Sequence, residues 1–351
     1  KRYILIFRFY YIVIFRSHNR TVHDDLSNIK HVTFYVINFP PSFGNVVRGR
    51  NNPNFSWRSR LSFGDDTWQV ILDKMEGYKN IEKELKEIGG FAYTYAGSIK
   101  RINGNSFCSV EVLKLINKVN HFLSFVRGSN AVTFCMYGYD DQGEVIWKDW
   151  SLRRTDRWTL TQDNWFSDQH SSEQLQMLFP GWSKLLDDED LGNEIPKILY
   201  WYCYAGKNTE GAAGTDGSLI LAIAALELFS YSYFGDKYEA NNLSNNIYKF
   251  LKELGIPFNV PKNLNSLYSY AMQKNWQTGP KAIVELRNEI VHPDRESIPG
   301  AHVCYEALQL ALWYVEMLLL RLCDFNGVYA NRLVQPKWNG LVERMPWNTL
   351  D

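Results

Sequence analysis

Three side chains that could act together on a phosphate lie within one short run, Arg287-Asn288-Glu289-Ile290-Val291-His292-Pro293. The guanidinium of Arg287 keeps a permanent positive charge and suits a phosphate oxygen. The imidazole of His292 can accept and donate a proton near neutral pH. Asn288 and His292 are four residues apart, so they share one face of a helix. The run therefore brings a fixed cation, a carboxamide and an acid–base group within about two helical turns.

The end of this run is also the expected end of its helix. Apolar residues at helical spacing predict a helix over Pro280–Val291. A proline disfavours the α conformation in the residue before it, and Pro293 follows His292 directly. We therefore expect His292 at the helix exit, with a partly freed side chain.

A single carboxylate, Glu227, interrupts the apolar helix predicted over Ser218–Tyr233. Because this helix is apolar nearly all round, Glu227 is expected to be at least partly buried, and buried acids are normally paired. It could anchor a neighbouring helix, or it could hold Arg287 in place behind the site. The sequence favours neither interpretation.

Other catalytic patterns are missing. The glycine-rich stretch Gly206–Gly217 contains a Gly-Lys pair, but Trp201 and Asn208 stand where a phosphate loop needs Gly and Ser or Thr. The chain has no Gly-x-Ser-x-Gly nucleophile motif. Its paired aspartates have no His or Cys at ligand spacing, and its five cysteines form no C-x-x-C pair. We therefore predict no metal and no cofactor, and interpret the cysteines as reduced, buried thiols.

The bulk composition is that of a soluble globular protein. The chain has 351 residues, of which 45% are hydrophobic and 22% charged, and this length suggests two or three domains. The formal net charge is zero, so no whole-molecule charge points to nucleic acid or membrane. Residues 1–60 are locally basic, but their basic residues are scattered. We favour outward-facing side chains over a phosphate-binding arm.

Periodicity divides the chain into a strand-rich half and a helical half. The first fifteen residues are apolar but interrupted by Arg8, so a strand is expected there and not a membrane span. Because the chain starts without an initiator Met, we expect that this end could be a fragment boundary. Further strands are predicted at His31–Phe39, Trp57–Phe63, Thr67–Leu72, Phe91–Ile102, Ala131–Tyr139 and Val145–Trp150, with helices at Asn80–Ile88 and Val110–Phe125. After residue 168 we expect helices only: Ser171–Leu178, Leu191–Ala205, Ser218–Tyr233, Glu239–Leu254, Leu264–Trp276, Pro280–Val291 and Ala301–Phe325.

The helical half resembles the HEPN superfamily over residues 215–333. The resemblance rests on Arg287-Asn288-x-x-x-His292, the upstream ILAIAALELF helix and the downstream ALQLALWYVEMLLLRL helix. It is most similar to HEPN domains fused to variable N-terminal regions in bacterial antiphage and abortive-infection proteins. It implies a four- or five-helix bundle that pairs with a second HEPN domain to form one composite, metal-independent endoribonuclease site.

The resemblance also implies roles for the motif residues. Arg287 would stabilise the charge on the reacting phosphate, and His292 would act as general base or general acid. Asn288 would orient the phosphate or the imidazole. Acidic residues slightly outnumber basic ones over residues 215–333. RNA contacts would therefore have to come from a groove across a dimer or from the basic N-terminal region.

We therefore predict an α+β chain with four parts. Residues 1–170 would form a β-rich mixed N-terminal domain, and residues 171–214 a helical connector with a glycine-rich linker. An all-α HEPN-like bundle would follow over 215–333, then a C-terminal tail over 334–351.

The predicted function is a cytoplasmic, homodimeric endoribonuclease that acts on RNA as a restrained toxin in phage defence. It would not enter a membrane, and its N-terminal domain would sense a phage-derived or nucleotide trigger. Two alternatives stay open. The HEPN-like module could bind nucleotide or nucleic acid through Arg287 and His292 without cleaving. It could also be a structural dimerisation bundle in which Arg287 pairs with Glu227.

Overall fold

The computed structural model describes residues 28–48, 56–151, 153–159, 163–207, 211–292, 299–335, 338 and 340–348. It divides into two compact units. The sheet unit comprises Lys1–Thr161 and Ser167–Ser183, and the helical unit comprises Gln162–Phe166 and Lys184–Asp351. The predicted α+β class is confirmed, because an antiparallel sheet is followed by a helical region.

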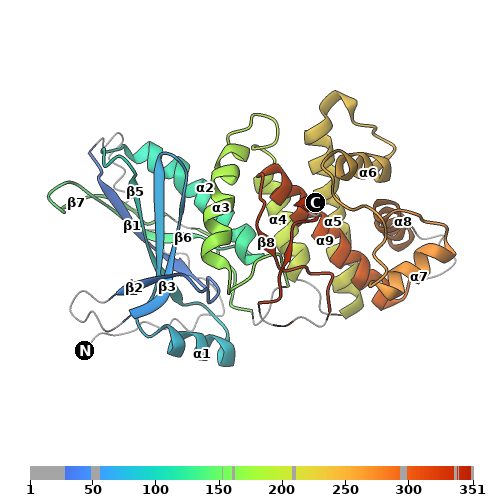
Figure 1. Cartoon of the computed structure of the whole chain (residues 1–351), viewed down its shortest axis with the longest axis horizontal. Helices are drawn as coiled ribbons and strands as arrows, with labels where there is room; N and C mark the ends of the chain where they lie inside the picture. Colours follow the sequence, from blue (N-terminus) through green and yellow to red (C-terminus); the bar gives the residue numbers. More distant parts are fainter. Residues whose placement is uncertain are drawn as a thin grey trace. The chain divides into compact units, whose positions relative to one another are not determined.

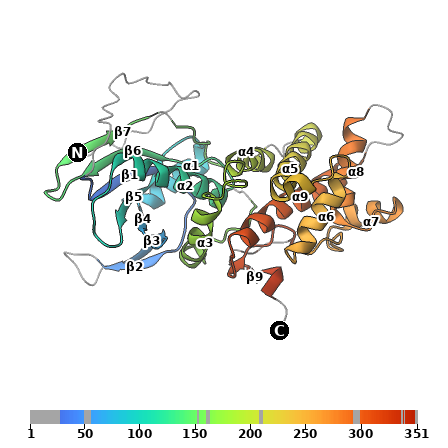
Figure 2. The ribbon, with the colours of Figure 1, turned by 90° about the horizontal axis from the view of Figure 1, so that it is seen from above.

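The sheet unit is built on a seven-stranded sheet in the order β2-β3-β4-β5-β1-β6-β7, with every described pairing antiparallel. Figure 2 shows the strands in this order, with α2 and α3 along one side of the sheet. The strands are β1 His31–Ile37, β2 Asn45–Arg48, β3 Ser56–Gly64, β4 Trp68–Lys74, β5 Tyr93–Arg101, β6 Thr133–Tyr139 and β7 Val145–Asp149. The helices are α1 Tyr78–Ile88, α2 Ser109–Arg127 and α3 Ser171–Leu185.

Alternating apolar residues place one face of this sheet against the helices. In β1, Val32, Phe34 and Val36 are buried, and the residues between them are half-buried. A strand exposes successive side chains on opposite faces, so this alternation defines an inner and an outer face. On the inner face, the Phe63 ring lies 5.1 Å from Phe122 of α2. The sheet unit therefore has its core between the inner face and its helices.

The helical unit packs around one long apolar helix, α9 Ala301–Leu322. Its other elements are α4 Ile195–Lys207, α5 Gly211–Phe234, α6 Leu243–Glu253, α7 Asn265–Gln273, α8 Gly279–Val291, β8 Val328–Tyr329 and β9 Glu343–Arg344, with short 3-10 turns at Gly235–Lys237 and Pro346–Asn348. Figure 1 shows α4, α5 and α9 lying together in this unit. Nearly every α9 side chain from Cys304 to Leu320 is buried, so α9 forms the centre of the core.

The predicted connector over 171–214 is not one element. Helix α3 runs to Leu185, well past the predicted end at Leu178. The helix contains Pro180, although a proline inside a helix removes a backbone hydrogen bond. The helix continues because Phe179 and Trp182 are both fully buried, and this burial outweighs the lost bond. Most of α3 belongs to the sheet unit, whereas α4 belongs to the helical unit.

The glycine-rich linker was also predicted too long. Gly206 and Lys207 end α4, and α5 already begins at Gly211. Glycine lowers helix propensity by about 1 kcal/mol per residue. The long apolar sequence that follows stabilises the helix enough to include these residues.

Three short strands were missed from the sequence. Strand β2 extends the sheet at its edge, and β8 pairs with β9 in a two-stranded ribbon, so the helical unit is not purely α-helical. The strand expected over the first fifteen residues lies outside the described residues, as do most basic side chains of residues 1–60.

Two described helical stretches are long and apolar enough to cross a membrane by length and composition alone. In Ala301–Leu322 the apolar window is 89% buried inside the protein, which fits a core helix. In Gly214–Lys237 only 44% is buried. Within the described chain, one apolar side of α5 is therefore only partly covered.

Candidate functional site

The predicted motif lies at the C-terminal end of α8, where the sequence placed it. The helix begins with Thr278, whose side chain accepts a hydrogen bond from the Lys281 amide (3.3 Å). Ile283 and Leu286 are fully buried, and α8 packs on α5, α6 and α9. The helix ends at Val291. The buried side of α8 therefore holds the motif firmly while its last turn reaches the surface.

Arg287 and Asn288 contact each other. Arg287 Nη1 donates a hydrogen bond to Asn288 Oδ1 at 3.2 Å. The Arg287 side chain is half-buried, and its Nε is fully buried without a hydrogen-bond partner among the described residues. A guanidinium held on one side keeps its remaining N–H groups available for an anion. Asn288 therefore contacts the arginine, and its expected role of orienting the phosphate or the imidazole stays a prediction.

His292 occupies the helix exit, as the proline predicted. Its backbone is extended, with φ −90° and ψ 130°, while its N–H still donates to the Asn288 carbonyl at 3.1 Å. The side chain is exposed. Among the described residues, His292 is joined to Asn288 through the main chain, and its exposed imidazole could meet a ligand.

The carboxylate within the motif is engaged elsewhere. Glu289 accepts hydrogen bonds from Tyr270 Oη of α7 (2.7 Å) and from Nζ of Lys274 (2.8 Å), the residue that follows α7. These contacts tie α8 to α7 and direct the negative charge away from Arg287. No carboxylate among the described residues pairs with Arg287. The positive charge of the motif is therefore not neutralised by the described part of the chain.

The expected contact between Glu227 and Arg287 is absent from the described residues. Glu227 is half-buried on α5, and its charge raises the pKa of Tyr238, although burial of that tyrosine contributes more. No hydrogen bond or ion pair joins it to Arg287. The interpretation of Glu227 as a residue that positions Arg287 is therefore wrong for this structure. The apolar sequence around Glu227 predicts that the carboxylate is partly buried, but it does not predict which residue the carboxylate contacts.

The buried ion pair of the helical unit uses different residues. Glu316 of α9 is fully buried and accepts hydrogen bonds from Arg332 at 2.6 and 3.0 Å. Tyr202 of α4 donates to the same carboxylate at 2.6 Å, and Gln309 accepts from Arg332 Nη1 at 3.0 Å. Sequence reasoning missed this network, although Glu316 lies among apolar residues of the helix predicted over 301–325, as Glu227 does in its own helix.

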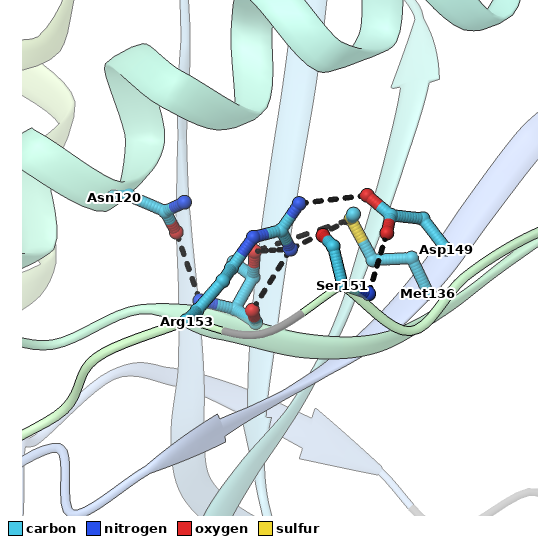
Figure 3. Close-up of polar contacts among 6 residues, drawn as sticks. Asn120, Met136, Asp149, Ser151 and Arg153 are labelled. Atoms are coloured by element: carbon cyan, nitrogen blue, oxygen red, sulfur yellow. Dashed lines mark hydrogen bonds and ion pairs between the residues drawn. The ribbon is translucent and has the colours of Figure 1, made fainter. Parts of the chain in front are cut away.

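A second polar cluster lies in the sheet unit (Figure 3). Arg153 Nη2 donates to Asp149 Oδ2 at 2.8 Å, and its Nη1 donates to the Thr133 carbonyl at 3.0 Å. The Asn120 side chain of α2 accepts from the Thr133 amide at 2.8 Å. Every charge in this cluster has a partner, and both Arg153 and Asp149 are largely buried. It fastens the end of β7 to β6 and is structural in character.

The cysteines divide into two groups. All five are free, and Cys203, Cys304 and Cys323 are buried as predicted. Cys108 and Cys135 are half-buried, which corrects the expectation that all were buried. Burial raises the pKa of the Cys323 thiol, so that side chain stays an inert apolar group.

Comparison with known proteins gives two family matches that follow the two units. The YopA central domain matches residues 24–161, and the YopA C-terminal domain matches residues 188–343. The second match includes the α8 motif. The HEPN resemblance is neither named nor excluded by these descriptions and stays a prediction.

A curated relative extends across both matches. The SPbeta prophage-derived protein YopA of Bacillus subtilis (strain 168) is 30% identical over 342 residues, which cover 93% of this chain and 74% of the relative. No solved structure matches the chain. The chain therefore belongs to the YopA family, with the central domain in its sheet unit and the C-terminal domain in its helical unit.

Proposed function

We propose that the helical unit is a metal-independent endoribonuclease of the HEPN type, and that the protein is a cytoplasmic, homodimeric toxin held inactive until phage infection. One observation carries this proposal. A half-buried arginine without a carboxylate partner among the described residues lies at the same helix end as an exposed histidine. A fixed cation beside an acid–base group is what RNA cleavage by its own 2′-hydroxyl requires.

The proposed step uses only groups of the protein and the RNA. His292 takes the proton from a ribose 2′-hydroxyl, and the 2′-oxygen attacks the adjacent phosphorus. The bond from phosphorus to the 5′-oxygen breaks, and that oxygen receives a proton from an acidic group, such as His292 of the second copy. Arg287 stabilises the charge on the phosphoryl oxygens. The products are a 2′,3′-cyclic phosphate and a free 5′-hydroxyl.

Two copies are part of the proposal because each chain carries the motif once. Helix α5 supports pairing, since it is apolar all round but only partly covered. One stripe at helical spacing contains three half-buried residues and an exposed tyrosine: Leu221, Ala224, Leu228 and Tyr231. Helix α5 also packs against α8. A second copy covering this stripe would lie beside the helix that bears the motif.

The phage context is supported by the relative, which is described as prophage-derived. A prophage protein can act against competing phages, which fits a restrained toxin. The sheet unit would then be the sensor for a phage-derived or nucleotide trigger.

The proposal is tested with two matched oligonucleotides, one all-RNA and one with 2′-deoxyribose at every position. We expect the protein to cleave the first and leave the second intact, because the attacking hydroxyl is missing. Cleavage of both would contradict the 2′-hydroxyl mechanism. His302→Ala is the control for substitution of a histidine, since His302 is an exposed histidine of the same unit that lies outside the motif. That variant should cleave like the wild type.

A non-catalytic module that only binds nucleotide or nucleic acid is the remaining alternative. It uses the same arginine and histidine to hold a phosphate. Retained RNA binding together with no turnover of any RNA by the wild-type dimer would favour it over the nuclease.

A further inference from the structure

The outer face of the sheet presents a row of aromatic rings. All three helices of the sheet unit pack on the inner face, through contacts such as Tyr78 of α1 on Tyr95 and Phe179 of α3 on Phe63. The outer positions of the three neighbouring strands β5, β1 and β6, and the residue that follows β7, carry the rings that we call the aromatic face: His31, Tyr35, Tyr93, Tyr137, Tyr139 and Trp150.

These rings contact one another across the strands. His31 of β1 stacks on Tyr139 of β6, with ring centroids 4.7 Å apart and planes 5° from parallel. Tyr35 lies 5.0 Å from Tyr93 of β5. Tyr137 meets Trp150 edge to face at 6.0 Å. The aromatic face therefore consists of three ring pairs, which lie on the outer side of the sheet between β5 and the end of β7.

The polar contacts of Asp149, which Figure 3 shows, determine on which side of the sheet the neighbouring Trp150 lies. Asp149 points inward, where Arg153 holds it. Because strand side chains alternate, Lys148 and Trp150 on either side of Asp149 point outward. Both are exposed, and 55% of Trp150 is accessible. An exposed tryptophan with a fixed backbone is a ready stacking surface for a flat ligand.

The charges on the aromatic face favour an anionic ligand. Lys148 faces Tyr137 in the strand register, and Lys100 faces His31; both lysines are exposed. On the described strands, Asp73 is the acidic residue of this face. Arg60 neutralises its charge by donating two hydrogen bonds of 2.9 and 2.6 Å. Further acidic residues lie beyond the sheet, at the tip of the hairpin between β6 and β7. The face itself is therefore aromatic with excess positive charge.

We propose that the aromatic face binds single-stranded nucleic acid, with bases stacked on its rings and phosphates held by Lys100 and Lys148. Bases in a duplex are already stacked on each other, so open rings on a sheet select an unpaired strand. Stacking does not depend on base identity, so little sequence preference is expected. Binding here does not rest on the nuclease proposal, because the face shares no residue with the α8 motif.

The test is fluorescence anisotropy with a labelled twelve-nucleotide strand, measured on the full chain carrying His292→Ala to prevent cleavage. Arms with single-stranded RNA, single-stranded DNA and duplex RNA of the same length identify the ligand. We expect at least one single strand to bind at least tenfold tighter than the duplex. Tyr137→Ala and Trp150→Ala should each weaken that binding about tenfold or more. Lys148→Glu should weaken it and reduce its salt dependence.

Matched variants separate stacking from other effects. Tyr137→Phe keeps the ring and should bind like the parent chain. Tyr200→Ala removes an exposed tyrosine of α4 and should also leave binding unchanged. Unchanged circular dichroism and melting temperature show that the variants fold. No measurable binding of either strand would overturn the proposal, as would unchanged affinity in the Tyr137→Ala, Trp150→Ala double variant. Equal binding of a polyglutamate peptide would identify an acidic protein as the partner instead.

Discussion

Arg332 and Glu316 form a buried ion pair in the helical unit, with Arg332 Nη2 2.6 Å from Glu316 Oε1 and Nε 3.0 Å from Oε2. Arg287 in the same unit has an amide partner and no described carboxylate partner. One arginine therefore stabilises the fold, and the other keeps its charge for a ligand. This contrast separates the structural role from the proposed catalytic one.

Breaking the buried pair should strongly destabilise the helical unit. Arg332→Leu strands the Glu316 carboxylate, whose side chain has no solvent exposure, and the expected loss is about 3–5 kcal/mol of the free energy of unfolding. The double variant Glu316→Leu, Arg332→Leu should lose less, because no charge is left buried. Urea titration followed by circular dichroism measures both. Equal losses in the single and double variants would show that the charges are not coupled.

Arg287→Ala should behave differently from Arg332→Leu. Since Arg287 anchors no described carboxylate, we expect its removal to change the free energy of unfolding by less than about 1 kcal/mol. The same urea titration provides the comparison. A large fall in stability would contradict this expectation, because it would show that Arg287 stabilises the fold.

The start of α8 should tolerate no side chain at Gly279. A Cβ there would lie 2.0 Å from Tyr314 Oη and 3.0 Å from its Cζ, and Tyr314 is fully buried. We expect Gly279→Ala to cost about 1–3 kcal/mol by overpacking. Gly217→Ala in α5 is the matched control, because its Cβ would meet nothing within 4 Å. The control should be neutral or stabilising by up to about 1 kcal/mol.

The sheet unit should lose stability in mild acid through His121 of α2. Burial lowers the pKa of this imidazole in the folded state, while the unfolded chain keeps the ordinary value near 6.5. Below that value the unfolded state binds protons that the folded state does not. Stability therefore falls as the pH drops from about 6.5 toward the lowered pKa.

Melting temperatures between pH 7 and pH 5 check this prediction. His121→Gln should show a smaller loss than the wild type. The exposed His302→Gln should not differ from it. Part of the loss should remain in the first variant, because burial also lowers the pKa of His31. An identical pH dependence in His121→Gln and wild type would contradict the assignment.

Much of the fold could be predicted because its signals are local. Six of the seven strands of the large sheet, and the described helices other than α3 and α5, lie close to their predicted ranges. The end of α8 was predicted almost to the residue, since Pro293 restricts the residue before it. The extension of α3 was not predictable in this way. It depends on burial of Phe179 and Trp182, which is a property of the packed unit.

The candidate site was predictable only in part. The side chains of Arg287, Asn288 and His292 were found from type and spacing alone. The contacts of these side chains were not predicted. Glu289, Glu227 and Glu316 all lie on helices with an apolar side, and the partner of each carboxylate depends on how the helices pack. The aromatic face was missed for a related reason. Its rings meet through the strand order β5-β1-β6-β7, which does not follow the order of the chain.

The central claim is that Arg287 and His292 cleave RNA without a metal. The most direct measurement is single-turnover cleavage of end-labelled RNA by the pure protein in excess chelator, with identification of the new ends. We expect 2′,3′-cyclic phosphate ends from the wild type. His292→Ala and Arg287→Ala should each lose at least about a hundredfold in rate. Cleavage that survives both substitutions, or that stops when the chelator is added, would contradict the account.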